Sequence, residues 1–184
     1  MLIVLASSSP RRRELLERAG VEFEVIPSPA DEIHDESMLP ADLCEANAVL
    51  KAEAVAISYP DRLVIGADTL VFIGDRALGK PRSLDDAREM LRLLSGRTHR
   101  VCSGVCVIFP GGRREVFHDL TEVDFRILDD EMIGGYFELV NPLDKAGAYG
   151  IQEHGDKLVA EIRGSFENVM GLPVERVVEI LNRG

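Results

Sequence analysis

Three arginines follow directly on a run of serines and a proline near the amino terminus, in the stretch ASSSPRRRELL (residues 6–16). A helix amino terminus carries partial positive charge and unpaired N–H groups, so arginines there are unfavourable unless an anion lies nearby. Serine hydroxyls and backbone amides can fix a phosphate at such a turn, and guanidinium groups can neutralise it. The spacing is not that of a P-loop. The stretch therefore predicts a phosphate site of another kind; the alternative is a well-capped helix with three surface arginines.

Asp68 lies inside an otherwise apolar run, LVIGADTLVFI (63–73). An ionised carboxylate in a buried strand loses hydration that is worth several kcal/mol unless a cation, a metal or a hydrogen-bond donor compensates it. The alternative is that the strand ends at Gly66 and that Asp68 only begins a turn. Because apolar residues continue at 70–72, we favour a functional carboxylate within the strand.

Two lysines are candidates to compensate that charge. Lys80 stands between a glycine and a proline, which fix the backbone on both sides of it. Lys51 lies one residue off the apolar stripe of a helix predicted over residues 40–58. Each has a plainer alternative as a solvated lysine, with the stem of Lys51 covering apolar neighbours.

Glu32 belongs to an acidic loop, SPADEIHDES (28–37). Acidic loops are usually solvated, but Mg²⁺ prefers one or two carboxylates together with phosphate oxygens. Asp31 and Asp35 compete with Glu32 for this role. A phosphate-binding turn, a buried acid, two lysines and a metal carboxylate together predict phosphoryl or nucleotidyl chemistry.

Composition limits the partners that such a site could serve. The formal net charge of −11 argues against an extended nucleic acid, because that affinity comes from a basic surface. The longest apolar runs, such as residues 101–109, are too short to span a bilayer, and no basic stretch of a secretory signal precedes the first strand. We therefore expect a cytoplasmic protein with a small anionic substrate and no membrane partner.

Cys102, Cys106 and His99 could be proposed as metal ligands. The sequence around them, THRVCSGVCVIF, alternates as a strand does and places both cysteines on one face. We therefore interpret the cysteines as small apolar core residues.

Hydrophobic periodicity and end signals predict a single α/β domain over residues 1–184, with a mixed, twisted sheet and flanking helices. Ser9 and Pro10 mark a helix start, and Gly20 its end. The predicted strands cover residues 2–6, 21–26, 63–73, 98–109, 114–128 and 157–164, and the later helices begin near Pro40, Ser83, Asp130 and Pro173.

Six motifs, taken in order along the chain, resemble those of the Maf family of nucleoside triphosphate pyrophosphatases. They are ASSSPRRRELL, GADT (66–69), GKP (79–81), LSGRTH (94–99), LDKAGAYGIQ (143–152) and GSFENVMGLP (164–173). The resemblance implies a fold similar to that of the inosine triphosphate pyrophosphatases, with two lobes around a nucleotide cleft. It also implies that the chain can form a homodimer.

The same resemblance implies hydrolysis between the α and β phosphates of a nucleoside triphosphate. Asp68 would act as general base on water, and Glu32 with Asp68 would hold a divalent cation, Mg²⁺ or Mn²⁺. The groups that would bind and neutralise the phosphates are Ser9, Arg12, Lys51 and Lys80.

Three positions resemble the branch of the family that prefers dTTP and UTP: Arg11 after the proline, Thr69 after the catalytic aspartate, and Gln152 at the end of YGIQ. The branch that prefers 7-methyl-GTP carries an aromatic residue in place of that arginine. A glutamine amide is complementary to the carbonyl and N3–H edge of uracil or thymine. Because an amide can also rotate to suit cytosine, Gln152 alone does not exclude CTP, and modified pyrimidine triphosphates also remain open as substrates.

A second class of function stays open at this level. Members of the family have been linked to inhibition of cell division (septum formation), so the chain could sense a nucleotide with little turnover. The presence of Asp68 and both lysines favours catalysis, since a sensor needs no group that activates water.

Overall fold

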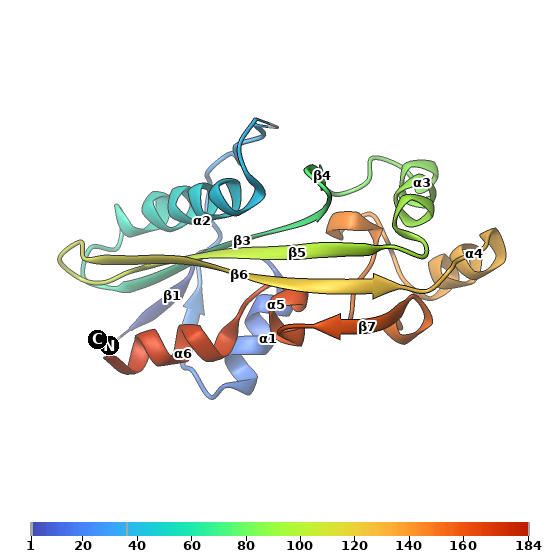
Figure 1. The fold of residues 1–184 in the computed structure, drawn as a ribbon. Helices are drawn as coiled ribbons and strands as arrows, with labels where there is room; N and C mark the ends of the chain where they lie inside the picture. Colours follow the sequence, from blue (N-terminus) through green and yellow to red (C-terminus); the bar gives the residue numbers. More distant parts are fainter. Residues whose placement is uncertain (1, 36, 184) are drawn as a thin grey trace. The chain divides into compact units, whose positions relative to one another are not determined.

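The structure is a computed structural model that describes residues 2–35 and 37–183 (Figure 1). Its strands are β1 (Ile3–Leu5), β2 (Phe23–Val25), β3 (Leu63–Ile73), β4 (Arg76–Leu78), β5 (Thr98–Ile108), β6 (Arg114–Phe125) and β7 (Val159–Arg163). Its helices are α1 (Pro10–Arg18), α2 (Pro40–Ala56), α3 (Leu84–Leu94), α4 (Asp130–Leu139), α5 (Phe166–Met170) and α6 (Val174–Arg183). Two short 3₁₀ turns, η1 (Ala146–Ala148) and η2 (Gly155–Lys157), precede β7.

Within the described residues the strands form one seven-stranded sheet in the order β2-β1-β3-β5-β6-β7, with β4 paired to β3. β1 runs parallel to both β2 and β3. β4 is antiparallel to β3, and β7 is antiparallel to β6. The mixed α/β fold predicted from the sequence is therefore confirmed.

The described chain divides into two compact units. The first unit takes its residues from the segments 1–69, 103–119 and 171–184, and the second from 70–102 and 120–170. The long strands β3, β5 and β6 supply residues to both units.

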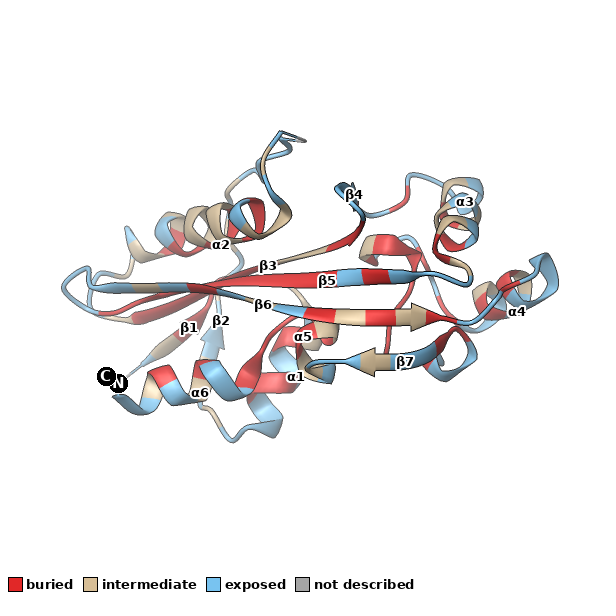
Figure 2. Ribbon diagram, in the orientation of Figure 1, coloured by how far each residue is buried: buried red, intermediate tan, exposed pale blue. Residues whose placement is uncertain are grey.

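In the first unit, helix α2 covers one face of the strands, and α1 and α6 lie on the other face (Figure 1). The buried residues concentrate along β1, β3 and the inner faces of these helices (Figure 2). Helix α2 approaches β3 closely because Gly66 has no side chain: a Cβ there would lie 2.7 Å from the backbone nitrogen of Ala52. Gly104 on β5 has the same role, since a Cβ would lie 2.6 Å from the nitrogen of Glu45. Two glycines thus fix how near α2 comes to the sheet.

The first helix begins and ends as the sequence predicts. The Ser9 hydroxyl accepts a hydrogen bond from the backbone N–H of Arg12, Pro10 is the first helical residue, and Gly20 adopts a φ of +72° after the helix end. The predicted strand 63–73 has the expected bounds, and the helix predicted from near Asp130 begins at that residue. Helix α5 was not predicted, because five residues are too few to show a helical period.

The two cysteines of β5 are core residues, as interpreted from their alternation. Cys102 and Cys106 are fully buried, and burial raises the pKa of the Cys106 thiol to about 12. In the second unit, His99 packs edge-on against Phe125 and Tyr149. Its Nε2 lies 2.7 Å from the Tyr149 hydroxyl, and its buried Nδ1 has no hydrogen-bond partner among the described residues.

Burial of His99 gives a testable pH dependence of stability. Desolvation lowers the pKa of the His99 imidazole from 6.5 to about 4, so the unfolded chain binds a proton that the folded chain does not. The free energy of unfolding therefore has its full value, as far as His99 is concerned, above pH 6.5, and it falls as the pH drops toward 4. From pH 7 to pH 5 we expect His99 to lower the free energy of unfolding by about 2 kcal/mol. Urea unfolding at both pH values measures it.

The His99→Gln variant removes the titrating group and should lose about 2 kcal/mol less than the wild type between those pH values. His34→Gln, at an exposed histidine, is the matched control and should keep the wild-type difference. Equal pH dependence in His99→Gln and the wild type would show that His99 does not titrate in this window.

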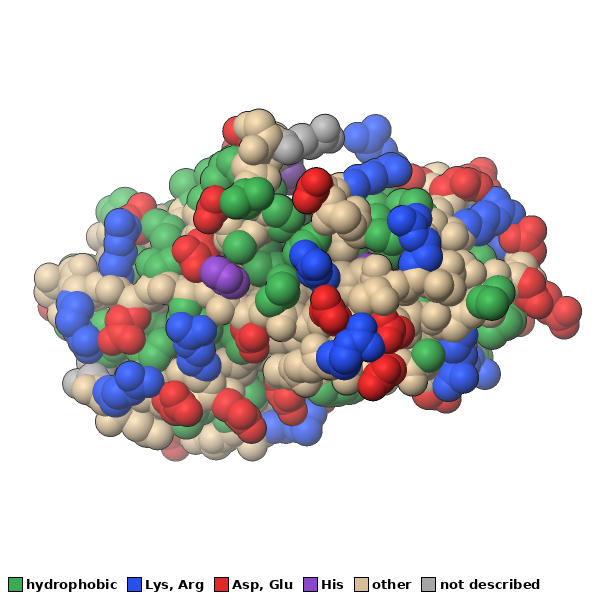
Figure 3. All heavy atoms as spheres, viewed as in Figure 1, with side chains coloured by type: hydrophobic (Ala, Val, Ile, Leu, Met, Phe, Trp, Pro, Cys, Tyr) green, Lys and Arg blue, Asp and Glu red, His purple; other side chains and the backbone are tan. Residues whose placement is uncertain are grey.

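No helix among the described residues combines the length and the apolar character that crossing a membrane requires. On the face shown in Figure 3, acidic and basic side chains are interspersed. The second unit has exposed ion pairs such as Arg92 with Asp130 and Arg163 with Glu122.

Candidate active site

Asp68 lies within β3, and its side chain is buried with both carboxylate oxygens engaged. Its Oδ1 accepts a hydrogen bond from Nζ of Lys51 at 2.7 Å, and its Oδ2 accepts one from Nδ2 of Asn47 at 3.2 Å. The strand continues to Ile73, so the alternative in which Asp68 begins a turn is wrong. A buried carboxylate held by a cation and an amide donor is oriented and charge-compensated.

Helix α2 supplies both of these donors. Asn47 and Lys51 are four residues apart and therefore lie on the same face of the helix. The close approach of α2 to β3 at Gly66 brings that face to Asp68. Only 12% of the Lys51 side chain is exposed, and its ammonium is held by two carboxylates. The alternative of a solvated surface lysine is therefore excluded for Lys51.

Glu32 is the acidic-loop residue that reaches this cluster. Its Oε1 lies 2.7 Å from Nζ of Lys51. Asp35 is exposed and accepts hydrogen bonds from the backbone and hydroxyl of Ser37 in a local turn, which lowers its pKa. Asp31 is exposed as well. Of these three acids, Glu32 is the one that contacts Lys51 among the described residues.

Asn47 is a site residue that the sequence analysis missed. Its Oδ1 accepts from the backbone N–H of Ile33 at 2.7 Å, and its Nδ2 donates to the carbonyl oxygen of Ile33 at 3.2 Å as well as to Asp68. One buried amide thus anchors both the loop next to Glu32 and the carboxylate of Asp68. The available signal was a polar residue on the apolar face of α2, one helical turn before Lys51.

The amino-terminal turn is built around Arg12, whose side chain is buried. Its Nε donates to the carbonyl oxygen of Gly171 at 2.8 Å, and its two terminal nitrogens donate to Oγ of Ser7 at 3.1 Å and to Oγ1 of Thr69 at 3.0 Å. Burial lowers the pKa of the Arg12 guanidinium, and the negative charge of Asp68 opposes that shift. The three arginines therefore differ, because Arg13 is exposed and pairs with Glu17 one turn along the helix.

Thr69 connects this arginine to the strand that carries Asp68. Its hydroxyl accepts from Arg12, lies 2.9 Å from Oγ of Ser103, and lies 3.2 Å from the carbonyl oxygen of Gly171. Gly171 has a φ of +123°, a conformation that favours glycine and that turns its carbonyl toward both side chains. The geometry assigns Thr69 a direct part in fixing the guanidinium.

The first unit brings these groups together where the carboxyl end of β1 lies beside the middle of the parallel strand β3. β1 ends at Leu5, which pairs with Ile65, and the chain then turns through the serines into α1. β3 continues past this pairing to Asp68 and Thr69. The carboxyl ends of parallel strands are where open α/β sheets bind ligands.

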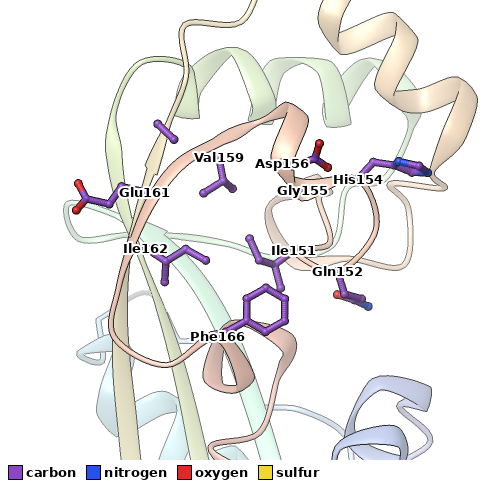
Figure 4. Close-up of a pocket in the computed structure, with 10 residues that line it drawn as sticks. Ile151, Gln152, His154, Gly155, Asp156, Val159, Glu161, Ile162 and Phe166 are labelled. Atoms are coloured by element: carbon purple, nitrogen blue, oxygen red, sulfur yellow. The ribbon is translucent and has the colours of Figure 1, made fainter.

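Two residues of the predicted site belong to the second unit. Lys80 is exposed, and its segment is held where the Gly79 carbonyl accepts a hydrogen bond from the N–H of Gly147. Gln152 is partly buried and lines a cavity of about 540 Å³ whose apolar wall includes Ile151 and Phe166 (Figure 4). The lining set is Ile151, Gln152, His154, Gly155, Asp156, Val159, Ala160, Glu161, Ile162 and Phe166. Arg11 remains in the first unit, half-buried on α1.

The family model described as Maf-like protein matches residues 2–184. The chain belongs to the Maf family. It is 51% identical over 180 residues to the dTTP/UTP pyrophosphatase of Akkermansia muciniphila, covering 98% of this chain and 95% of that one. It is 52% identical over 180 residues to the dTTP/UTP pyrophosphatase of Moorella thermoacetica, covering 97% and 93%.

One solved structure supports the fold. The Ham1 protein of Staphylococcus aureus aligns with a TM-score of 0.55 at 17% identity, covering 99% of this chain and 98% of that one. At this identity the likeness concerns the fold alone. It agrees with the α/β architecture that the Maf motifs led us to expect.

The site of this Maf protein contains two carboxylates that could be ligands of a small divalent cation. Glu32 and Asp68 each contact the Lys51 ammonium, at 2.7 Å in both cases. Among residues 2–35 and 37–183, no three His, Cys, Asp or Glu side chains cluster as a complete metal site. Two carboxylates without a third are typical of Mg²⁺, which takes its remaining ligands from water and substrate phosphates.

Proposed function

We propose that this Maf protein hydrolyses dTTP and UTP to the nucleoside monophosphate and pyrophosphate. Modified pyrimidine triphosphates whose base keeps the carbonyl and N3–H edge of uracil are included in this proposal. The observation that carries the proposal is the buried Asp68 carboxylate between Lys51 and Asn47, in a chain about half identical to proteins named dTTP/UTP pyrophosphatase. The two donors orient the carboxylate, and a carboxylate oxygen can accept a proton from water.

In the proposed reaction a water oxygen attacks the α phosphorus, and the bond from that phosphorus to the bridging oxygen breaks. The proton of the water passes to the Asp68 carboxylate, and pyrophosphate leaves with the bond electrons. Lys51 and Asn47 hold Asp68 in place, while Ser9, Arg12 and Lys80 bind the phosphates as negative charge develops. A divalent cation, Mg²⁺ or Mn²⁺, would be held by Glu32 and Asp68 and would neutralise phosphate charge.

Arginine at position 12 suits phosphate binding because its donors are only partly used. A guanidinium has five N–H groups, and within the described residues three hydrogen bonds from it reach protein acceptors. In this proposal the remaining N–H groups donate to a phosphate oxygen. Base selection in this proposal belongs to Arg11, Thr69 and Gln152.

The two units together form one catalytic domain in this proposal, since the family match extends from residue 2 to residue 184. Free nucleoside triphosphates are metabolites of the cell interior, so we place the activity in the cytoplasm.

The test is pyrophosphate release by the purified protein with Mg²⁺, across UTP, dTTP, CTP, GTP, 7-methyl-GTP and ATP. We expect UTP and dTTP to be turned over fastest, with the monophosphate as the second product. Faster turnover of 7-methyl-GTP would overturn the base assignment and leave the phosphate chemistry in place. Absence of turnover with all six nucleotides would favour the nucleotide-binding regulator of cell division instead.

A further inference from the structure

The amide of Gln152 is held by the residue that follows it. Nε2 of Gln152 donates a hydrogen bond to Oε1 of Glu153 at 3.2 Å. An ionised carboxylate accepts hydrogen bonds and donates none, so only the NH₂ end of the amide can face it. The carbonyl end of Gln152 must therefore point elsewhere. This orientation follows from the chemistry of the pair.

The carbonyl oxygen of Gln152 is left without a partner. Oε1 is buried and accepts no hydrogen bond from the described residues. A buried acceptor in this state costs about 1–3 kcal/mol and is rare in native proteins. A ligand N–H group that reached it would remove that cost. Gln152 is also one of the residues that line the cavity of about 540 Å³ (Figure 4).

Glu153 is itself fixed, by a buried lysine. Its Oε2 lies 3.1 Å from Nζ of Lys145, whose side chain is only 4% exposed. Lys145 also contacts Oδ1 of Asp144 at 2.8 Å and donates to the carbonyl oxygen of Asn141 at 3.0 Å. Gly150 leaves room for this arrangement, because a Cβ there would lie 2.8 Å from Cε of Lys145 and 3.3 Å from Oε1 of Glu153.

We propose that Glu153, held by Lys145, fixes the Gln152 amide so that it offers its carbonyl oxygen to the N3 position of a pyrimidine and discriminates against cytosine. Uracil and thymine carry an N3–H donor that this oxygen can accept. Cytosine carries a lone pair at N3, which would face the oxygen directly, and Gln152 cannot rotate to meet it without placing its own carbonyl against the Glu153 carboxylate. The C5 methyl group lies off this edge, so dTTP and UTP are treated alike.

This inference rests on the proposed function, and it assigns Glu153 and Lys145 as positioning residues that act through Gln152. The test is the ratio of kcat/KM for UTP to that for CTP in the wild type and in Glu153→Gln. The amide at position 153 can present either end to Gln152, so the constraint is lost. We expect the wild type to prefer UTP and the ratio to fall about tenfold in the variant, as for one hydrogen bond. Glu153→Ala should lower the ratio in the same direction.

Asp144→Asn is the matched control. It removes a carboxylate from the same lysine without touching the Gln152 amide, so it should keep the wild-type ratio. A purely structural role of Glu153 would lower kcat/KM for both nucleotides equally and leave the ratio unchanged, which would overturn the inference. So would a wild type that does not distinguish UTP from CTP.

Binding of the α,β-imido analogues of UTP and CTP, measured by calorimetry, gives the same ratio without turnover. If the wild type binds the UTP analogue more tightly and the preference is lost in Glu153→Gln, the inference holds even when hydrolysis is absent and the proposed enzymatic function has failed. If hydrolysis is present but neither ratio changes in the variant, the inference alone fails. If neither analogue binds, both are wrong.

Discussion

Replacing Asp68 by asparagine is expected to lower kcat for UTP by about a thousandfold, within the range found for loss of a general base. The side chain keeps its shape but loses the group that accepts a proton from water. Both neighbours of this position are donors, Lys51 to Oδ1 and Asn47 to Oδ2, so the new NH₂ group must face one of them. Single-turnover measurement of pyrophosphate release at saturating UTP isolates the chemical step.

The control for this prediction is Asp35→Asn in the acidic loop. Asp35 is exposed and its hydrogen bonds stay within the turn at Ser37, so kcat should remain within about twofold of the wild type. Thermal melts of both variants show whether the fold is intact. If Asp68→Asn kept a tenth or more of the wild-type kcat while folded, Asp68 would not be the general base.

The elements that carry the site could be predicted because their signals are local. The run 63–73 is apolar over its whole length apart from two residues, and it forms β3 with the same bounds. Ser9 is a typical N-cap residue and Pro10 suits the first helical position, and α1 begins there. Asp68 was recognisable because a charge inside such a run needs compensation whatever the tertiary structure is.

The partners of these residues could not be predicted, because they depend on contacts between distant segments. Asn47 meets Asp68 across 21 positions of sequence only because Gly66 lets α2 approach β3. The buried environment of Arg12 depends on the carbonyl of Gly171, at the other end of the chain. Sequence periodicity reports which face of an element is buried, and it does not report what packs against that face.

Replacing Arg12 by lysine is expected to have the second large effect on activity, and the neighbouring Arg13 allows a matched comparison. Arg12→Lys keeps the positive charge but replaces a planar fork by a point charge that cannot donate to Ser7, Thr69 and Gly171 in the same geometry. We expect the free energy of unfolding to fall by about 2 kcal/mol, since buried acceptors are left unsatisfied. We expect kcat/KM for UTP to fall about a hundredfold, as for loss of one oriented donor to the reacting group.

Arg13→Lys makes the same chemical change one residue along the same helix turn. Arg13 is exposed, and its ion pair with Glu17 lies at the surface. The free energy of unfolding should therefore change by less than about 0.5 kcal/mol, and kcat/KM by less than about twofold. Urea unfolding and initial rates on both proteins provide the comparison. Since the two variants carry equal charge at neighbouring positions, a shared electrostatic attraction for the nucleotide would affect them alike. Equal losses would therefore contradict the assignment of Arg12, whereas a loss confined to Arg12→Lys would show that the fixed guanidinium geometry binds the phosphate.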